Sequence, residues 1–457
     1  MSLLFFAVAG RSMGPDKFGL FSFAVAFAAM GSVFSDLGIG LFATREIARD
    51  RSIGRVLIAD GIGLRLAASF VVALLTVGAA ILLRYPHDTV QVVAVLGGYT
   101  VVNSVATYCG SLFQGVQLNA LTAVARFAQA GSLVSGALLL SRSTPSPILY
   151  ATLYVLAGTL AVLVSLVLMA GRSLPPGISF HRQRWLDLCR RALPFGTTTV
   201  LVSLYYWNGS VILSKISGNA AVGVLGAAQR LMVGVGLLSA AFAGAVYPVL
   251  SITFVSDRHR LPRLLAKAFR YMVAISIPIG VSCLAFAGPV IALLYGPRFA
   301  EAADILRILA WWGMLMPLNA ILAIYFLAAN RASVVTKQAG ISLAVNLAVN
   351  VFLIPLWGSA GAAWGLVAAE VAGLGYLLVQ QLKSQDRIRL VDAARSVGSV
   401  VAASAVAVAA ALAGFRTHAL VGIVFGLGAY VILLRLLNVV DPDDMALLRG
   451  VTLNHLV

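Results

Sequence analysis

The stretch RSMGPDKFGLFSFAVA, residues 11–26, returns in pattern as KISGNAAVGVLGAAQR, residues 215–230. In both, a cation stands three residues before a glycine, a second glycine follows five residues later, and small residues continue as a helix. The offset is 204 residues for Arg11 with Lys215, for Gly14 with Gly218 and for Gly19 with Gly223. This self-similarity predicts two tandem copies of one unit, each opening with a helix, a glycine turn and a second helix.

The composition places this repeat in lipid. The chain is 60% hydrophobic and 11% charged, with a mean hydropathy of +0.96, whereas soluble domains carry about 25% charged residues. The net charge of +17 does not indicate nucleic acid, because the basic residues fall in short loops between apolar runs. The three cysteines are scattered, so no disulfide framework and no metal site is implied.

Long apolar runs define the expected membrane spans, since about 20 residues cross the hydrocarbon layer. We expect an all-α polytopic membrane protein with spans at 18–42, 57–83, 89–113, 119–140, 148–170, 194–216, 220–250, 269–295, 304–329, 334–354, 359–381, 396–414 and 419–436. Residues 1–10 form half a span without the features of a signal peptide. We therefore expect a truncated start and a natural count of fourteen helices.

Basic residues predict the orientation and the domains. With the N-terminus inside, 22 Lys and Arg residues fall in inward loops and 7 in outward loops, as the positive-inside rule requires, and both termini are cytoplasmic. We expect an N-lobe at 1–170 with helices 1–6, an inter-lobe linker at 171–193 and a C-lobe at 194–381 with helices 7–12. Residues 382–457 then hold helices 13 and 14 and a cytoplasmic tail. Tandem halves are typical of transporters whose substrate path lies between them.

Three cytoplasmic connectors look amphipathic: 179–194, 257–272 and 385–398. In the second, Leu261, Leu264, Leu265 and Ala268 share one helical face. We predict that this connector lies on the membrane surface. For the other two, a surface helix and an ordinary charged loop stay equally open.

Several segments resemble one family. GPDKFGLFSFAVAF (14–27) and SDLGIGLFATREIARDR (35–51) resemble the opening of the polysaccharide-transport family, the Wzx-like lipid-linked oligosaccharide flippases of bacteria, within the multidrug/oligosaccharidyl-lipid/polysaccharide exporter superfamily. Residues 194–231 and 293–331 extend the likeness. It implies fourteen helices in two six-helix lobes around a cavity, with two helices appended. It also implies movement of undecaprenyl-pyrophosphate-linked oligosaccharide across the bacterial cytoplasmic membrane by alternating access, for O-antigen, exopolysaccharide or capsule.

The sequence departs from this family at one position. Members often carry an acid in helix 7 at the position that aligns with Gly209, where this chain reads YYWNGSVILSK. Ion coupling that depends on such an acid is therefore in doubt.

Charged residues at bilayer depth supply the candidate site, because each costs roughly 2.5–3.5 kcal/mol on insertion scales. We predict that Arg230, with Arg11 and Lys215 at matching places in the two halves, binds the pyrophosphate, and that Arg126 contributes. An ion pair of Arg230 with Glu370 is the structural alternative. Hydrogen bonds to sugar hydroxyls are expected from Asn103, Gln114, Gln129, Asn346 and Asn350.

Two acids are candidates for coupling to H⁺ or Na⁺. Glu370 lies centrally in its span, and Asp36 lies near the cytoplasmic end of another. For Asp36 we favour a structural role, in which the carboxylate binds Arg45 or Arg49 of the following loop. We expect no other cofactor and no metal.

Two other functions remain as alternatives. A multidrug or small-metabolite exporter of the same superfamily would share the fold, whereas a membrane glycan polymerase or ligase needs a large outward loop. The sequence has no P-loop, and we interpret the acidic cluster 441–444 as a helix cap. We expect a monomer that is not an enzyme, with membrane lipids, the lipid-linked substrate, a polysaccharide polymerase and glycosyltransferases as partners, and no nucleic acid.

Overall fold

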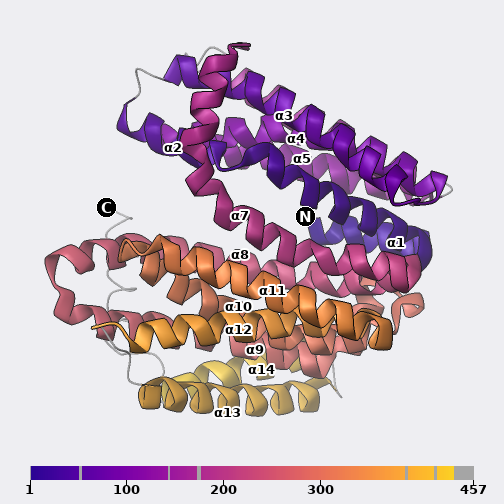
Figure 1. The fold of residues 1–457 in the computed structure, drawn as a ribbon. Helices are drawn as coiled ribbons and strands as arrows, with labels where there is room; N and C mark the ends of the chain where they lie inside the picture. The colour runs from indigo at the N-terminus through magenta and orange to yellow at the C-terminus, as the bar shows by residue number, and fades with distance from the viewer. Residues whose placement is uncertain are drawn as a thin grey trace. The chain divides into compact units, whose positions relative to one another are not determined.

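The computed structural model describes residues 2–50, 54–142, 145–171, 177–385, 390–415 and 419–436, and these are helical with short connections (Figure 1). The α-helices are α1 (Ser2–Asp36), α2 (Ile39–Arg49), α3 (Gly54–Leu82), α4 (His87–Gly115), α5 (Asn119–Leu140), α6 (Pro147–Ala170), α7 (Arg182–Ile216), α8 (Gly218–Ser256), α9 (Leu261–Tyr295), α10 (Ala302–Ala328), α11 (Ala332–Trp357), α12 (Ser359–Leu382), α13 (Leu390–Phe415) and α14 (Ala419–Leu436). Within these ranges, ten helices are long and apolar enough to cross a membrane. The prediction of an all-helical multi-pass membrane protein is confirmed.

Most predicted spans match observed helices closely. The bounds predicted for α3–α6, α10–α12 and α14 lie within a few residues of those observed. Helices α7, α8, α9 and α13 extend beyond the apolar runs that predicted them. In α7 and α9 the extension consists of charged and apolar residues of the preceding connector, which continue the helix. The acidic cluster 441–444 and the predicted tail from 437 onward lie outside the described residues.

Helix α1 is a hairpin of two helical arms. Gly14, with φ 75° and ψ 172°, interrupts the helix. The rings of Phe5 and Phe21 are 6.2 Å apart and those of Phe6 and Phe18 are 6.3 Å apart. In a straight helix Phe5 and Phe21 would stand about 24 Å apart, so the chain reverses at Gly14. The predicted glycine turn of the first repeat is confirmed, and Gly218 (φ 80°) forms its counterpart between α7 and α8.

The span predicted for 18–42 is wrong at its end. Leu37 (φ 41°) and Gly38 (φ 85°) break the helix after Asp36, and α2 begins at Ile39. Helix α2 buries Ile39, Phe42, Ala43 and Ile47 on one side. Arg45 and Arg49, predicted in a loop, therefore lie on the exposed side of an amphipathic helix.

The chain divides into two compact units, which we describe separately. Unit 1 holds residues 1–230, 291–305 and 342–366, and unit 2 holds residues 231–290, 306–341 and 367–457. Unit 1 contains an apolar core contributed by α2, α3, α4, α6 and α7, with Tyr108, Leu112 and Phe113 at most 1% exposed. The expected lobes at 1–170 and 194–381 and the linker at 171–193 stay predictions.

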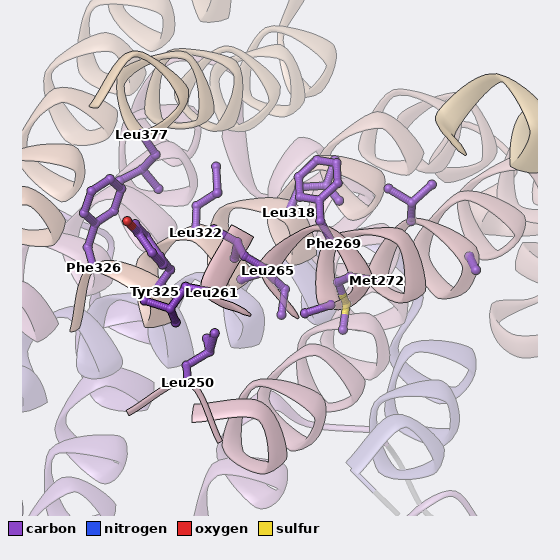
Figure 2. Close-up of a cluster of buried hydrophobic side chains, with 14 of the residues drawn as sticks. Leu250, Leu261, Leu265, Phe269, Met272, Leu318, Leu322, Tyr325, Phe326 and Leu377 are labelled. Atoms are coloured by element: carbon purple, nitrogen blue, oxygen red, sulfur yellow. The ribbon is translucent and has the colours of Figure 1, made fainter. Parts of the chain in front are cut away.

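Unit 2 has its own core, which corrects the membrane-surface prediction for 257–272. Leu261, Leu265 and Phe269 of α9 pack with Leu318 and Phe326 of α10 (Figure 2). Leu261 and Leu265 are at most 1% exposed. The apolar face of this connector is therefore covered by protein, and the connector is the first part of α9.

Candidate functional site

Arg230 projects from α8 into an aromatic setting within unit 1. It lies twelve residues after Gly218, or about 18 Å along the helix. Its guanidinium carbon is 3.7 Å from the centre of the Phe6 ring and 5.7 Å from that of Trp207. Tyr154 and Tyr295 also lie within electrostatic reach of its charge. A cation over ring faces is stabilised by the ring quadrupoles.

None of the residues that the structure describes uses the hydrogen-bonding capacity of Arg230. The side chain is half-buried, and within the described ranges it has no hydrogen bond and no ion pair. Ring faces attract the charge but accept none of the five N–H donors. The group is thus held in place by Phe6 and Trp207 while its donors stay available to an anion or to water.

Arg11 and Lys215 occupy equivalent places at two helix ends. Arg11 Nε donates to the carbonyl of Leu294 at 2.9 Å, and Arg11 Nη2 donates to that of Leu293. Lys215 Nζ donates to the carbonyl of Leu83 at 2.5 Å. Both cations therefore bind carbonyls at the C-terminal end of a helix, the last residues of α9 for Arg11 and the residue after α3 for Lys215, where the helix dipole favours positive charge.

Arg126 lines a small polar cavity of about 30 Å³ in unit 1, space for one or two water molecules. The cavity lies among α4, α5 and α6, and its polar lining consists of Asn103, Thr107, Thr122, Arg126, Gln129 and Ser165. The structure thus brings Arg126 together with two of the amides expected to meet sugar hydroxyls. The side chain of Gln114 is exposed elsewhere on α4.

Asp36 has a different partner from the one expected. Its Oδ1 pairs with Arg65 Nη1 at 2.5 Å and accepts the backbone N–H of Gly40 at 3.3 Å. Arg65, 4% exposed, also donates to the carbonyl of Ser104. Asp36 therefore connects the end of α1 to α3 and to the start of α2.

Glu370 is buried in unit 2 at 5% exposure. Trp312 Nε1 donates to Oε1 at 3.3 Å, and Asn319 Nδ2 donates to Oε2 and, at 3.0 Å, to the Glu370 backbone carbonyl. Both donors come from α10. The sequence did not predict them, although polar groups inside an apolar span are a usable signal.

Asn346 and Asn350 are buried against Asn208. Asn208 Nδ2 donates to Asn346 Oδ1 at 2.7 Å, and Asn350 Nδ2 donates to Asn208 Oδ1 at 2.8 Å. Asn346 and Asn350 are fully buried. In this structure the two amides bind Asn208, at the position just before Gly209, and the expectation that they bind sugar hydroxyls stays a prediction.

Comparison with known families agrees with this arrangement. A family model described as "Polysaccharide biosynthesis protein" matches residues 1–254, more than half of the chain. The chain belongs to this polysaccharide biosynthesis protein family. The resemblance inferred from the sequence is confirmed at this level, and so is the prediction of a transporter rather than an enzyme.

Two curated relatives match this family member over limited segments. The probable low-salt glycan biosynthesis flippase Agl15 of Haloferax volcanii is 25% identical over 160 residues, which are 35% of this chain and 34% of the relative. An uncharacterised membrane protein of Methanocaldococcus jannaschii is 31% identical over 97 residues, 21% of this chain and 19% of that protein. The match thus spans about a third or less of either relative.

Solved structures show the fold over most of the chain. An inward-facing multidrug resistance MATE family transporter of the MOP superfamily superposes with a TM-score of 0.69 at 14% identity, covering 84% of this chain and 94% of that one. The lipid II flippase MurJ in an inward closed conformation superposes with a TM-score of 0.68 at 16% identity, covering 94% and 95%. At such identities the likeness establishes the shared transporter fold alone.

Proposed function

We propose that this protein is a flippase that moves an undecaprenyl-pyrophosphate-linked oligosaccharide across the bacterial cytoplasmic membrane by alternating access, for surface polysaccharide synthesis. Family membership supports the glycan pathway. The likeness to Agl15, a probable flippase, and to MurJ, a lipid II flippase, supports this class of transport. Both termini of this chain face the cytoplasm in the proposal, in line with the distribution of Lys and Arg.

The observation that carries the proposal is that Arg230 is positioned by aromatic rings while its N–H donors have no acceptor among the described residues. Its charge is positioned by Phe6 at 3.7 Å, yet the described protein offers its N–H donors no acceptor. A pyrophosphate supplies acceptor oxygens that the planar guanidinium can bind two at a time. Aromatic faces also exclude water around the contact, which strengthens the attraction between the two charges.

The polar cavity at Arg126 supports a glycan as the second part of the substrate. Asn103 and Gln129 offer both donors and acceptors beside a cation. At about 30 Å³ the cavity takes one substituent rather than a whole sugar ring. We assign it to a hydroxyl or acidic substituent of the oligosaccharide, with Arg126 as its cation.

Reconstituted vesicles test the proposal. The purified protein is placed in liposomes that carry fluorescent undecaprenyl-pyrophosphate oligosaccharide on one leaflet, and arrival on the other leaflet is measured with an impermeant quencher. We expect Arg230→Gln to abolish flipping, and Arg230→Lys to retain a small part of it, because lysine keeps the charge but loses the paired donors. Arg142→Gln, an exposed cation after α5, serves as the matched control and leaves the rate unchanged.

Substrate competition separates this function from its rivals. Export of a hydrophobic cation with no flipping of the lipid-linked glycan would overturn the proposal in favour of a drug exporter. Growth of the glycan chain in the same vesicles would overturn it in favour of a polymerase. Equal flipping by Arg230→Gln and by the unsubstituted protein would remove Arg230 from the site.

A further inference from the structure

Arg11 connects the first repeat to the second. It lies one turn before the turn glycine Gly14, and its guanidinium binds the carbonyls of Leu293 and Leu294 at the end of α9. Gly10, next to Arg11, lies against Tyr295, since a Cβ at Gly10 would be 2.6 Å from that ring. Close approach of the hairpin to this helix end is therefore built into the sequence.

Lys215 makes the same connection in the opposite direction. It lies three residues before the turn glycine Gly218 and binds the carbonyl of Leu83, just after α3. Its ammonium also lies 3.6 Å from the centre of the Tyr85 ring. In both cases a tyrosine follows, two residues later, the leucine whose carbonyl accepts the hydrogen bond: Tyr85 after Leu83 and Tyr295 after Leu293. We call the two contacts, Arg11 on Leu293–Leu294 and Lys215 on Leu83, the crossed caps.

A close backbone crossing lies next to the two turns. A Cβ built on Gly19 would be 3.0 Å from the backbone nitrogen of Gly223, and one on Gly223 would be 3.1 Å from that of Gly19. Of the pairs that define the 204-residue repeat, Gly19 and Gly223 therefore contact each other. Arg11 and Lys215, like Gly14 and Gly218, are equivalent positions in the two copies. All of these residues belong to unit 1.

We propose that the two crossed caps act together as a lock. They hold closed the end of unit 1 at which Gly14 and Gly218 lie, and both caps open together. The Arg11 cap joins α1 of the first repeat to α9 of the second, and the Lys215 cap joins α7 of the second repeat to the end of α3 of the first. Because Gly19 and Gly223 fix how the two repeats cross, a movement that pulls Arg11 from α9 also pulls Lys215 from α3. The proposal rests on alternating access, part of the proposed function, and is independent of which substrate is carried.

The chemistry of the caps suits a lock that must open repeatedly. A salt bridge separated in lipid leaves two charges without partners. A cation on a helix end instead leaves a neutral carbonyl, which water reaches as the end opens. The contacts therefore favour the closed arrangement, yet breaking them costs less free energy than separating a salt bridge.

Distance measurements by double electron–electron resonance test the lock. In a background with the three native cysteines replaced by serine, one spin-label pair at Asp16 and Ala300 reports on the Arg11 cap. A second pair at Asp88 and Ser217 reports on the Lys215 cap. All four positions are exposed. The protein is measured in lipid nanodiscs without substrate, so the result does not depend on flipping.

We expect Arg11→Gln to shift both distance distributions to longer values, and Lys215→Gln to do the same. Lys17→Gln is the matched control, because Lys17 donates to the carbonyl of Pro145 within its own repeat, and it leaves both distributions unchanged. If Arg11→Gln does not fold, judged by gel filtration, Arg11→Lys replaces it with a smaller shift of both pairs. A shift confined to the pair beside the substituted cation, or no shift, would overturn the lock.

Discussion

Gly19 of α1 and Gly223 of α8 cross with their backbones in contact. A Cβ on Gly19 would stand 1.8 Å from the carbonyl oxygen of Asn219, and one on Gly223 would stand 2.3 Å from that of Pro15. Real Cβ atoms do not approach backbone oxygens so closely, and a backbone cannot rotate away as a side chain does. The repeat therefore carries glycine at these positions because the two copies touch there, as helices packed through small residues do in lipid.

The first prediction follows from this crossing. We expect Gly19→Ala and Gly223→Ala each to destabilise the protein by about 1–3 kcal/mol, because the added methyl group forces the helices apart. Thermal unfolding in detergent measures the effect. Gly131→Ala is the control, since nothing lies within 4 Å of its Cβ position, and it is neutral or slightly stabilising. Equal stability of Gly19→Ala and Gly131→Ala would contradict the crossing.

The sequence predicted the parts of the fold that depend on local chemistry. Glycine at 14 and 218 is needed for positive φ, and apolar length sets the helix bounds, so both were visible as patterns. The break at Leu37 was not, because leucine rarely adopts a φ of 41°. The sequence also could not predict the partners of Arg11 and Lys215. These two cations bind backbone carbonyls, which every residue supplies.

The same limit applies to the faces of helices. Leu261 and Leu265 form an apolar face whether lipid or protein covers it, and only the packing of α10 on α9 decides between them. For Asp36 the sequence correctly favoured pairing with a cation, but proximity along the chain pointed to Arg45 or Arg49. The structure instead brings in Arg65, 29 residues away.

The second prediction concerns this pair, Asp36 and Arg65. Replacing Asp36 with alanine leaves the 4% exposed Arg65 without its counter-charge, and we expect a loss of about 3 kcal/mol in unfolding free energy. In a double-mutant cycle with Arg65→Met, much of this loss is recovered, because the uncompensated charge is gone. Additive losses would argue against a coupled pair. Arg49→Ala, which breaks the exposed contact with Glu46, is the control and costs at most about 0.5 kcal/mol.

The third prediction concerns coupling through Glu370. If its carboxylate binds and releases the coupling proton, Glu370→Gln holds the site in a neutral form, and flipping loses its dependence on pH. Trp312→Phe removes one donor to Glu370 but leaves the titrating group, so flipping still depends on pH, although the rate changes and the pH profile shifts. The assay is vesicle flipping over a range of pH. An unchanged rate and pH profile in Glu370→Gln would exclude this residue from coupling.

The fourth prediction separates packing from substrate contact in the asparagines. Asn350→Ala removes the donor to Asn208 Oδ1 and to Asn346 Oδ1. Asn346 Oδ1 keeps its bond from Asn208 Nδ2, so the substitution leaves the buried Oδ1 of Asn208 unpaired. We expect a loss of about 1–2 kcal/mol, at the lower end of the range for such groups, because the Oδ1 of Asn350 is itself buried without a partner among the described residues.

Asn103→Ala is the counterpart, since that amide faces the cavity at Arg126. We expect it to leave thermal stability within about 0.5 kcal/mol while slowing the flipping of the lipid-linked glycan. Asn350→Ala shows the reverse pattern, with lower stability and, in the fraction that stays folded, an unaltered rate. Slower flipping by Asn350→Ala at unchanged stability would indicate that the buried amides contact the substrate. A cluster with only a structural role cannot slow flipping without lowering stability.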